Sequence, residues 1–143
     1  MPVFVDTNVL VYAWDDADPA KQERAAAWID RLWTEGSGRL SFQVLQELYV
    51  TLTRKLAPGM NPEDARADVR DLMAWRPVTI GPLVLERAWS IEQRYGISFW
   101  DALIVAAAGS ASCETLLTED LQHGAVLEGV RVVDPFREPP PGG

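Results

Sequence analysis

The feature that most constrains the fold is a regular alternation of short apolar runs with longer segments of helical character. The short runs, rich in β-branched residues, are typical of buried strands. We expect strands at 2–5, 39–42, 78–80, 115–118 and 130–133. Apolar spacing and helix start and stop signals predict helices at 8–14, 19–33, 44–55, 61–75, 82–95 and 98–111. The alternation favours a three-layer α/β fold, with a mostly parallel five-stranded sheet and helices on both faces.

The 143 residues are enough for one domain, which we place at residues 1–136. The Pro/Gly-rich tail at 137–143 is expected to be disordered. Cys113 is the single cysteine, which excludes an internal disulfide and favours a buried, inert thiol. No run approaches the ~20 apolar residues that span a bilayer, and no signal-like segment opens the chain. We therefore expect a cytoplasmic protein with no membrane partner.

The formal net charge of −8 disfavours broad, non-specific binding to nucleic acid, since phosphate contacts normally come from Lys and Arg. It does not exclude a small site at which a metal ion supplies the positive charge. The basic residues closest in sequence to the candidate site are better explained as solvated helix faces than as RNA contacts; they are Lys21, Arg24, Arg39, Arg54 and Lys55. Likewise, the six tryptophans are expected to be core or interface anchors rather than a base-stacking platform.

Four acids lie where solubility alone does not explain them: Asp6, Glu47, Asp101 and Asp120. Asp6 ends the first strand, and in open α/β sheets ligands gather at the carboxyl ends of strands. Glu47 lies within a predicted helix, Asp101 opens an Ala-rich helix, and Asp120 follows a late strand.

Each acid also has an ordinary explanation. Asp6 is suited to a turn at the end of a strand, and Glu47 to a water-facing helix position. Asp101 completes a capping-box pattern with Ser98, and Asp120 is suited to the first turn of a helix capped by Thr118. Glu119 is best explained by simple solvation.

Four clustered carboxylates would need protons or a cation to offset their repulsion, which is about 4 kcal/mol per pair at 4 Å and an effective dielectric constant of ~20. Hard cations such as Mg²⁺ take oxygen ligands, whereas His123, the single histidine, fits a surface loop. Carboxylates around Mg²⁺ favour phosphodiester hydrolysis. Asn8 and Thr118 could then orient waters or the carboxylates.

Four motifs resemble those of the PIN domain, and more narrowly the VapC toxins of bacterial VapBC toxin–antitoxin pairs. The motifs, in order along 2–134, are Phe4–Leu10, Ser41 with 46–48, 98–104 and 116–121. The resemblance implies a PIN-like fold and an Mg²⁺- or Mn²⁺-dependent endoribonuclease. Its catalytic and metal-binding acids would be Asp6, Glu47, Asp101 and Asp120, supported by Asn8 and Thr118. It also implies a VapB-like antitoxin that covers the acidic site, an RNA substrate and a homodimer.

Three other interpretations remain open. A PIN nuclease could process RNA without a toxin role. A phosphotransfer domain also has an acid after its first strand, but it usually carries a second acid two residues later, where this chain has Asn8. A non-catalytic binding module could retain the fold, although the complete acidic set disfavours it.

Overall fold

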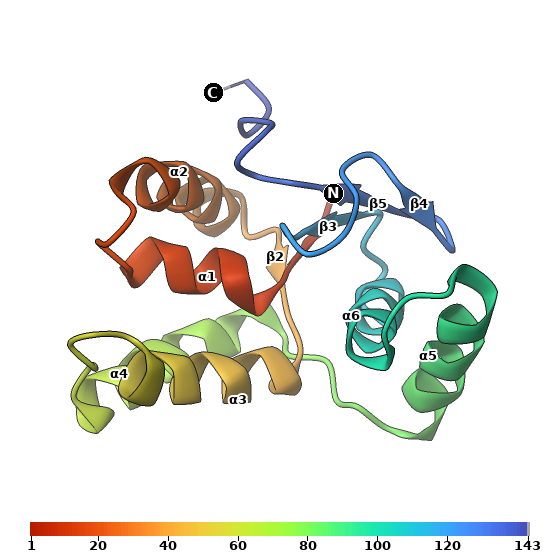
Figure 1. Cartoon of the computed structure of the whole chain (residues 1–143), viewed down its shortest axis with the longest axis horizontal. Helices are drawn as coiled ribbons and strands as arrows, with labels where there is room; N and C mark the ends of the chain where they lie inside the picture. The colour runs from red at the N-terminus through yellow and green to blue at the C-terminus, as the bar shows by residue number, and fades with distance from the viewer. Residues whose placement is uncertain (143) are drawn as a thin grey trace.

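The computed structural model describes residues 1–142, which form one five-stranded sheet flanked by helices (Figure 1). The strands are β1 (Val3–Val5), β2 (Gly38–Arg39), β3 (Thr115–Leu117), β4 (Val126–Leu127) and β5 (Val130–Val133). Their order across the sheet is β2-β1-β3-β5-β4, and all neighbours are parallel except β4 and β5. The predicted α/β class and mostly parallel sheet are therefore confirmed.

Two strand predictions need correction. The strand expected at 39–42 ends at Arg39, because Ser41 serves as the N-cap of the next helix and its hydroxyl accepts a hydrogen bond from the Val44 N–H at 3.2 Å. The strand expected at 78–80 is absent; Val78 forms only an isolated parallel bridge to Ser41. The fifth strand is instead β4, which pairs with β5 across a tight turn. The sequence did not predict β4, because two residues are too few to show a periodic pattern.

The helices follow the predicted segments closely. They are α1 (Thr7–Trp14), α2 (Pro19–Glu35), α3 (Phe42–Val50), α4 (Pro62–Leu72), α5 (Pro82–Tyr95) and α6 (Phe99–Ser110). The π-helical turn η1 (Thr51–Lys55) extends α3, and the 3₁₀ turn η2 (Met73–Trp75) extends α4. The N-cap of α1 is Asp6, whose carboxylate accepts from the Thr7 N–H. This places the acid at both the end of β1 and the start of α1.

Helices α1 and α2 lie on one side of the sheet and α5 and α6 on the other, and α3 packs against both α1 and α4 (Figure 1). Helix α1 packs against α2, and α5 packs against α6. The stretch Ala102–Ala108 of α6 is buried throughout, which accounts for its apolar, Ala-rich sequence. Gly38 lies directly under the Trp75 ring, where an added Cβ would come within 2.6 Å of ring carbons.

Several minor predictions can be compared with the structure. Cys113 is buried, as predicted, and desolvation raises the pKa of its thiol to about 11. Trp28 and Trp75 are core residues, whereas Trp33, Trp89 and Trp100 are exposed. Within residues 1–142, no helix is long and apolar enough to cross a membrane.

The disorder expected at 137–143 stays a prediction. In the described part of this tail, the Trp28 indole N–H donates to the Glu138 carbonyl at 2.9 Å. Glu138 also forms an ion pair with Arg131 at 3.3 Å. Residue 143 lies outside the described residues.

Candidate active site at the carboxyl ends of β1 and β3

The parallel pairing of β1 with β3 brings Asp6 beside Thr118. Val5 and Leu117 are register partners, so the residues that follow each strand meet at one edge of the sheet. The Asp6 N–H donates to the Leu117 carbonyl at 3.0 Å. One carboxylate oxygen of Asp6 accepts from the Thr7 N–H at 2.7 Å, and the other accepts from the Thr118 hydroxyl at 2.9 Å. Asp6 is only 7% exposed and is therefore held rigidly at the sheet edge.

The Asn8 amide lies between the carboxylates of Asp6 and Asp120. Its Nδ2 is 3.3 Å from Asp6 Oδ2, 3.0 Å from Asp120 Oδ2 and 3.2 Å from the Thr118 hydroxyl. Thr118 Oγ1 also accepts from the Asp120 N–H at 3.1 Å. An amide –NH₂ has only donors to offer, so it can approach two carboxylates without repulsion. Asn8 and Thr118 therefore link Asp6 to Asp120.

Asp120 does not lie in the first turn of a helix capped by Thr118, which was its ordinary explanation. No helix begins after Thr118 within the described chain; residues 119–121 form a bend instead. The Thr118 hydroxyl thus fixes the Asp120 backbone without capping a helix. Asp120 itself is exposed, so its carboxylate remains accessible from solvent beside the buried Asp6.

Glu47 reaches the same region from α3. One of its oxygens lies 3.4 Å from the Thr7 hydroxyl, and the other accepts from the Gln43 amide at 2.7 Å. Thr7 directly follows Asp6, so this contact joins α3 to the start of α1. Sequence reasoning did not identify Thr7 or Gln43. Thr7 could have been identified because its hydroxyl lies directly next to Asp6. The only sequence feature that points to Gln43 is its position one helical turn before Glu47.

Asp101 lies in the first turn of α6 and is half-buried. Its backbone N–H donates to the Ser98 hydroxyl at 3.1 Å, which is one half of the capping box expected from the sequence. Among the described residues, the cap bond between these two is the one from the Asp101 N–H, and the reciprocal bond from the Ser98 N–H to the Asp101 carboxylate is not formed. Among the four acids, Asp6, Asp120 and Glu47 are connected by the hydrogen bonds above, whereas Asp101 has no direct hydrogen bond to them. Its carboxylate is not consumed by the cap.

The environment of Asp6 raises its pKa from 3.8 to about 6. Burial is the largest cause, because it disfavours the charged carboxylate; the Thr118 and Thr7 hydrogen bonds oppose it by stabilising the anion. The negative charges of Asp120 and Glu47 raise the pKa further. Asp120 and Glu47 are therefore close enough to Asp6 to repel its charge, and a cation at this position would relieve that repulsion.

The donor chemistry fits a hard divalent cation. Within residues 1–142, no three His, Cys, Asp or Glu side chains are arranged to hold a metal ion together. Mg²⁺, however, commonly takes one or two carboxylates and fills its other positions with water and phosphate oxygens. Asp6 and Asp120, both within hydrogen-bonding distance of one Asn8 nitrogen, supply two such carboxylates. The side-chain atoms here that could bind a metal ion are oxygens, which suits Mg²⁺ or Mn²⁺.

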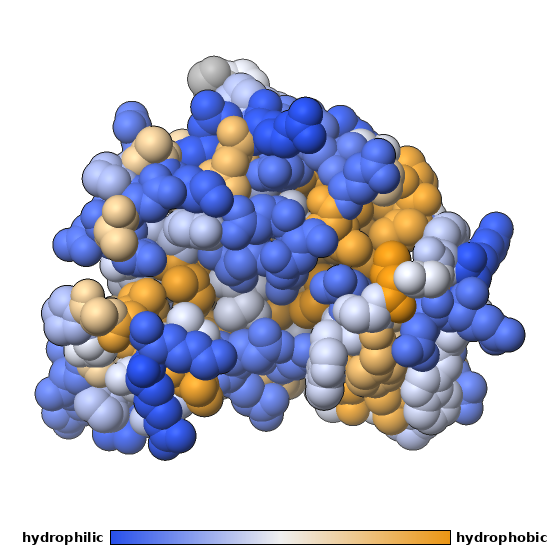
Figure 2. All heavy atoms as spheres, in the orientation of Figure 1, coloured by the Kyte–Doolittle hydropathy of each residue, from blue (hydrophilic) through white to orange (hydrophobic). Residues whose placement is uncertain are grey.

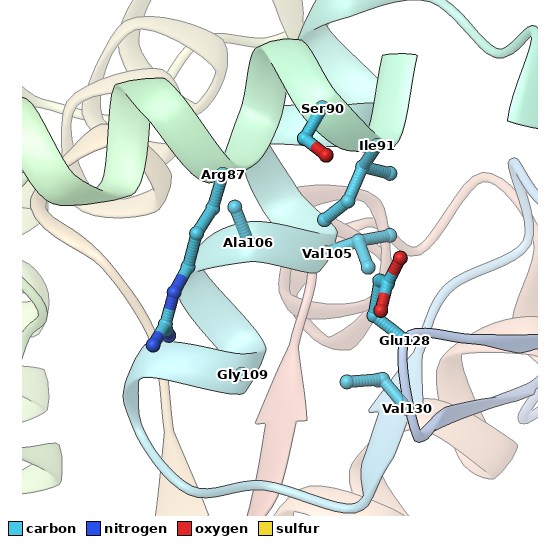
Figure 3. A pocket seen from close by; sticks show the side chains of 8 residues that line it. All are labelled: Arg87, Ser90, Ile91, Val105, Ala106, Gly109, Glu128 and Val130. Atoms are coloured by element: carbon cyan, nitrogen blue, oxygen red, sulfur yellow. The ribbon is translucent and has the colours of Figure 1, made fainter. Parts of the chain in front are cut away.

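Other candidate features lie elsewhere. A hollow of about 400 Å³ between α5, α6 and β5 is shown in Figure 3, and none of the four acids lines it. His123 is partly exposed and its Nδ1 accepts from the Asp134 N–H, in keeping with the predicted surface-loop role. Arg24 and Arg39 donate to backbone carbonyls, which favours a structural role over RNA contact.

Comparisons with solved structures show the same fold in toxin–antitoxin proteins. A toxin–antitoxin complex from Klebsiella pneumoniae has a TM-score of 0.65 and 21% identity, covering 94% of this chain and 98% of that one. VapC20 from Mycobacterium tuberculosis, a sarcin-ricin loop cleaving toxin, has a TM-score of 0.59 and 24% identity over 80% of this chain and 86% of that one. VapBC2 from Rickettsia felis, bound to a promoter DNA fragment, has a TM-score of 0.57 and 17% identity, covering 92% and 97%.

No curated protein matches the sequence significantly. The sequence model described as the PIN domain matches residues 3–126, which include Asp6, Glu47, Asp101 and Asp120. This match spans most of the chain, and the solved structures above share its fold. The chain therefore belongs to the PIN domain family.

Proposed function

We propose that this protein is a metal-dependent endoribonuclease that acts as the toxin of a VapBC-like toxin–antitoxin pair. The proposal assigns catalysis and binding of Mg²⁺ or Mn²⁺ to Asp6, Glu47, Asp101 and Asp120, with Asn8 and Thr118 in support. The observation that carries it is the buried carboxylate of Asp6, whose pKa is raised by burial and by the charges of Asp120 and Glu47. Membership in the PIN domain family and structural neighbours named as toxin–antitoxin proteins support the same assignment.

The roles of the residues follow from their positions. Asp6 and Asp120 would hold the cation, which supplies charge neutralisation at the phosphate and lowers the pKa of a bound water. Asn8 keeps these two carboxylates together without adding negative charge. Glu47 and Asp101 would approach the cation directly or through bound waters. A carboxylate that is not committed to the metal can orient the attacking water and accept its proton.

The direct test is cleavage of RNA by the purified protein with Mn²⁺ or with chelator. We expect new RNA ends only with the cation, and strongly reduced cleavage by Asp6→Asn and Asp101→Asn. Asp16→Asn is a matched control, since it removes an exposed acid from the loop before α2. Sequencing the RNA ends after induction in cells tests the target and the growth arrest together. Equal cleavage and equal growth arrest by the wild type and both site variants would instead favour a non-catalytic binding module.

We propose that the antitoxin, besides covering the acidic site, also contacts a second surface away from the four acids. A groove of about 550 Å³ between α1, α2 and α4 has an apolar base that includes Ile29 and Leu72. Three carboxylates line it: Asp30, Asp68 and Asp71. Partial burial, followed by the charges of Asp71 and Asp64, raises the pKa of Asp68. Such a groove favours a partner segment that carries both apolar and basic side chains.

Two further parts of the proposal have separate tests. A small reading frame beside the gene, whose product copurifies with this chain and blocks cleavage, supports the toxin role. Cleavage without such a partner and without growth arrest would favour a PIN nuclease that processes RNA. The proposed homodimer is tested by the mass of the purified protein in solution. Exposed apolar side chains available for such contacts are Trp33, Phe42, Val50, Met73, Leu83, Trp89 and Trp100, and Figure 2 shows apolar surface at the sides of one face.

A further inference from the structure

Lys21, near the start of α2, belongs neither to the sequence motifs nor to the proposed metal ligands, and its ammonium lies against Glu119, Tyr12 and Phe136. Its Nζ is 2.8 Å from a carboxylate oxygen of Glu119 and 3.3 Å from the Tyr12 hydroxyl. The same nitrogen lies 4.7 Å from the centre of the Tyr12 ring and 4.9 Å from that of Phe136. These two rings meet edge to face, with centres 5.0 Å apart. We call the ion pair of Lys21 with Glu119 the Lys21–Glu119 clasp.

The clasp should be stronger than an ordinary ion pair on the protein surface. Both side chains are partly buried, with 34% and 24% of their surfaces exposed, so solvent screens the pair less than it would on an open helix face. Two aromatic rings border the ammonium, and such contacts are attractive in themselves. The Glu119 hydrogen bond is the largest cause that raises the pKa of Lys21. Lys21 is thus a cation already engaged within the protein and not a free contact for an RNA phosphate.

The other end of the clasp belongs to the loop that carries Asp120. Glu119 lies between Thr118, whose hydroxyl bonds to Asp6, and Asp120, whose carboxylate bonds to Asn8. The Glu119 N–H also donates to the side-chain amide oxygen Oδ1 of Asn8 at 3.4 Å. Residues 118–120 are therefore each tied to a neighbour, and Glu119 is the one that anchors this loop to α2.

The clasp also bears on the charge of the site. Glu119 directly precedes Asp120, and its carboxylate is paired with the Lys21 ammonium at 2.8 Å. Without its partner, the Glu119 carboxylate would be an uncompensated charge next to the proposed ligand Asp120.

We propose that Lys21 is a positioning residue: by binding Glu119 it holds the 118–120 loop so that Asp120 faces Asn8 and Asp6. This inference rests on the proposed metal-dependent function. A positioning role and a long-range charge effect predict opposite results when Lys21 is neutralised. Removing a positive charge near a cation site should tighten cation binding, whereas releasing the loop that carries a ligand should weaken it.

The test is calorimetric titration of the full-length protein with Mn²⁺, without RNA, at fixed pH and ionic strength. Lys21→Met removes the charge but keeps an unbranched side chain against the rings, and Lys55→Met removes the same charge from an exposed position in η1. We expect Lys21→Met to weaken Mn²⁺ binding about tenfold or more, the usual cost of losing a group that orients a metal ligand. Lys21→Arg, which keeps the ion pair, should retain affinity, and Lys55→Met should bind as tightly as the wild type or more tightly.

A second pair of variants keeps the test valid if Lys21→Met fails to fold, as judged by circular dichroism. Glu119→Gln breaks the clasp from the other side, and Glu114→Gln removes the same charge from an exposed position. A greater loss of Mn²⁺ affinity in Glu119→Gln than in Glu114→Gln that persists at high ionic strength, where the long-range effect of the lost charge is screened, supports the clasp. Unchanged or tighter binding by folded Lys21→Met, or equal losses in the two Glu variants, overturns it while leaving the proposed function intact. A wild type that binds no Mn²⁺ overturns the metal-dependent function itself, and the clasp role with it.

Discussion

Replacement of Asp6 by Asn should change how the stability of the metal-free protein depends on pH. In the folded protein the pKa of Asp6 is raised from 3.8 to about 6, mainly by burial, and Asp6 is 7% exposed. The folded state therefore holds the Asp6 proton more tightly than the unfolded chain does. The resulting stabilisation is fully present below pH 3.8 and is lost as pH rises through 6.

The size of the effect follows from the same two values. A rise in pKa from 3.8 to about 6 corresponds to about 3 kcal/mol, of which about 2–3 kcal/mol is lost between pH 4 and 7. Asn cannot titrate, so the Asp6→Asn protein lacks this component. The wild type loses this stability from pH 4 to 7 and the variant does not. The free energy of unfolding of Asp6→Asn minus that of the wild type should therefore increase by about 2–3 kcal/mol over this interval.

The assay is urea denaturation in chelator at several pH values, for wild type, Asp6→Asn and the control Asp16→Asn. Subtracting the wild-type curve removes the contributions of the other acids, and the pH-independent cost of the Asn hydrogen bonds shifts the difference without changing its slope. If the difference in free energy of unfolding between Asp6→Asn and wild type stays constant from pH 4 to 7, burial and neighbouring acids do not raise the pKa of Asp6, and the argument is refuted. Asp16→Asn should give such a flat difference, because Asp16 is exposed.

Three more predictions concern the site and its support. Asp101→Asn should leave the free energy of unfolding within ~0.5 kcal/mol of wild type, because the cap uses its backbone N–H, while Mn²⁺ affinity and RNA cleavage fall together by about tenfold or more; unchanged affinity by calorimetry would remove Asp101 from the metal site. In chelator, which keeps the protein metal-free, Asn8→Asp should lower the free energy of unfolding by about 2–4 kcal/mol at pH 8, because it places a third negative charge between two carboxylates. Added Mn²⁺ should restore part of this loss in thermal melts. Gly38→Ala should cost about 1–3 kcal/mol in urea denaturation, because its Cβ would overlap the Trp75 ring, whereas Gly109→Ala in α6 has open space and should cost nothing; equal effects would contradict the close packing.

Local sequence signals predicted most of the secondary structure. Apolar spacing and capping residues predicted every long helix, since a helix of three or more turns repeats its pattern several times. The errors fell on short strands. Val78 has a strand-like sequence but forms a single bridge, and Val126–Leu127 pairs as a strand although two residues carry no pattern. Strand pairing depends on which backbone groups the rest of the fold leaves free, and that is not encoded locally.

The candidate site divides in a similar way. The chemical type of Asp6, Asn8, Thr118 and Asp120, and the positions of the first two at the end of a strand, were evident from the sequence. The bonds that link them span more than 100 residues of chain and depend on the register of β1 with β3. The same holds for the contact of Thr7 with Glu47, which requires α3 to pack beside the start of α1.

The sequence by itself determined the α/β class, the helices, the four candidate acids and the amide at position 8. The tertiary structure decided that Asp6 is buried beside Asp120 and Glu47, that the Asp101 carboxylate is free of its cap, and that Lys21 binds Glu119. The physical reason is that residue type and periodicity act over a few neighbouring residues, whereas desolvation and Coulomb interaction depend on distances in space. Those distances are set only when parallel strands and packed helices bring remote segments together.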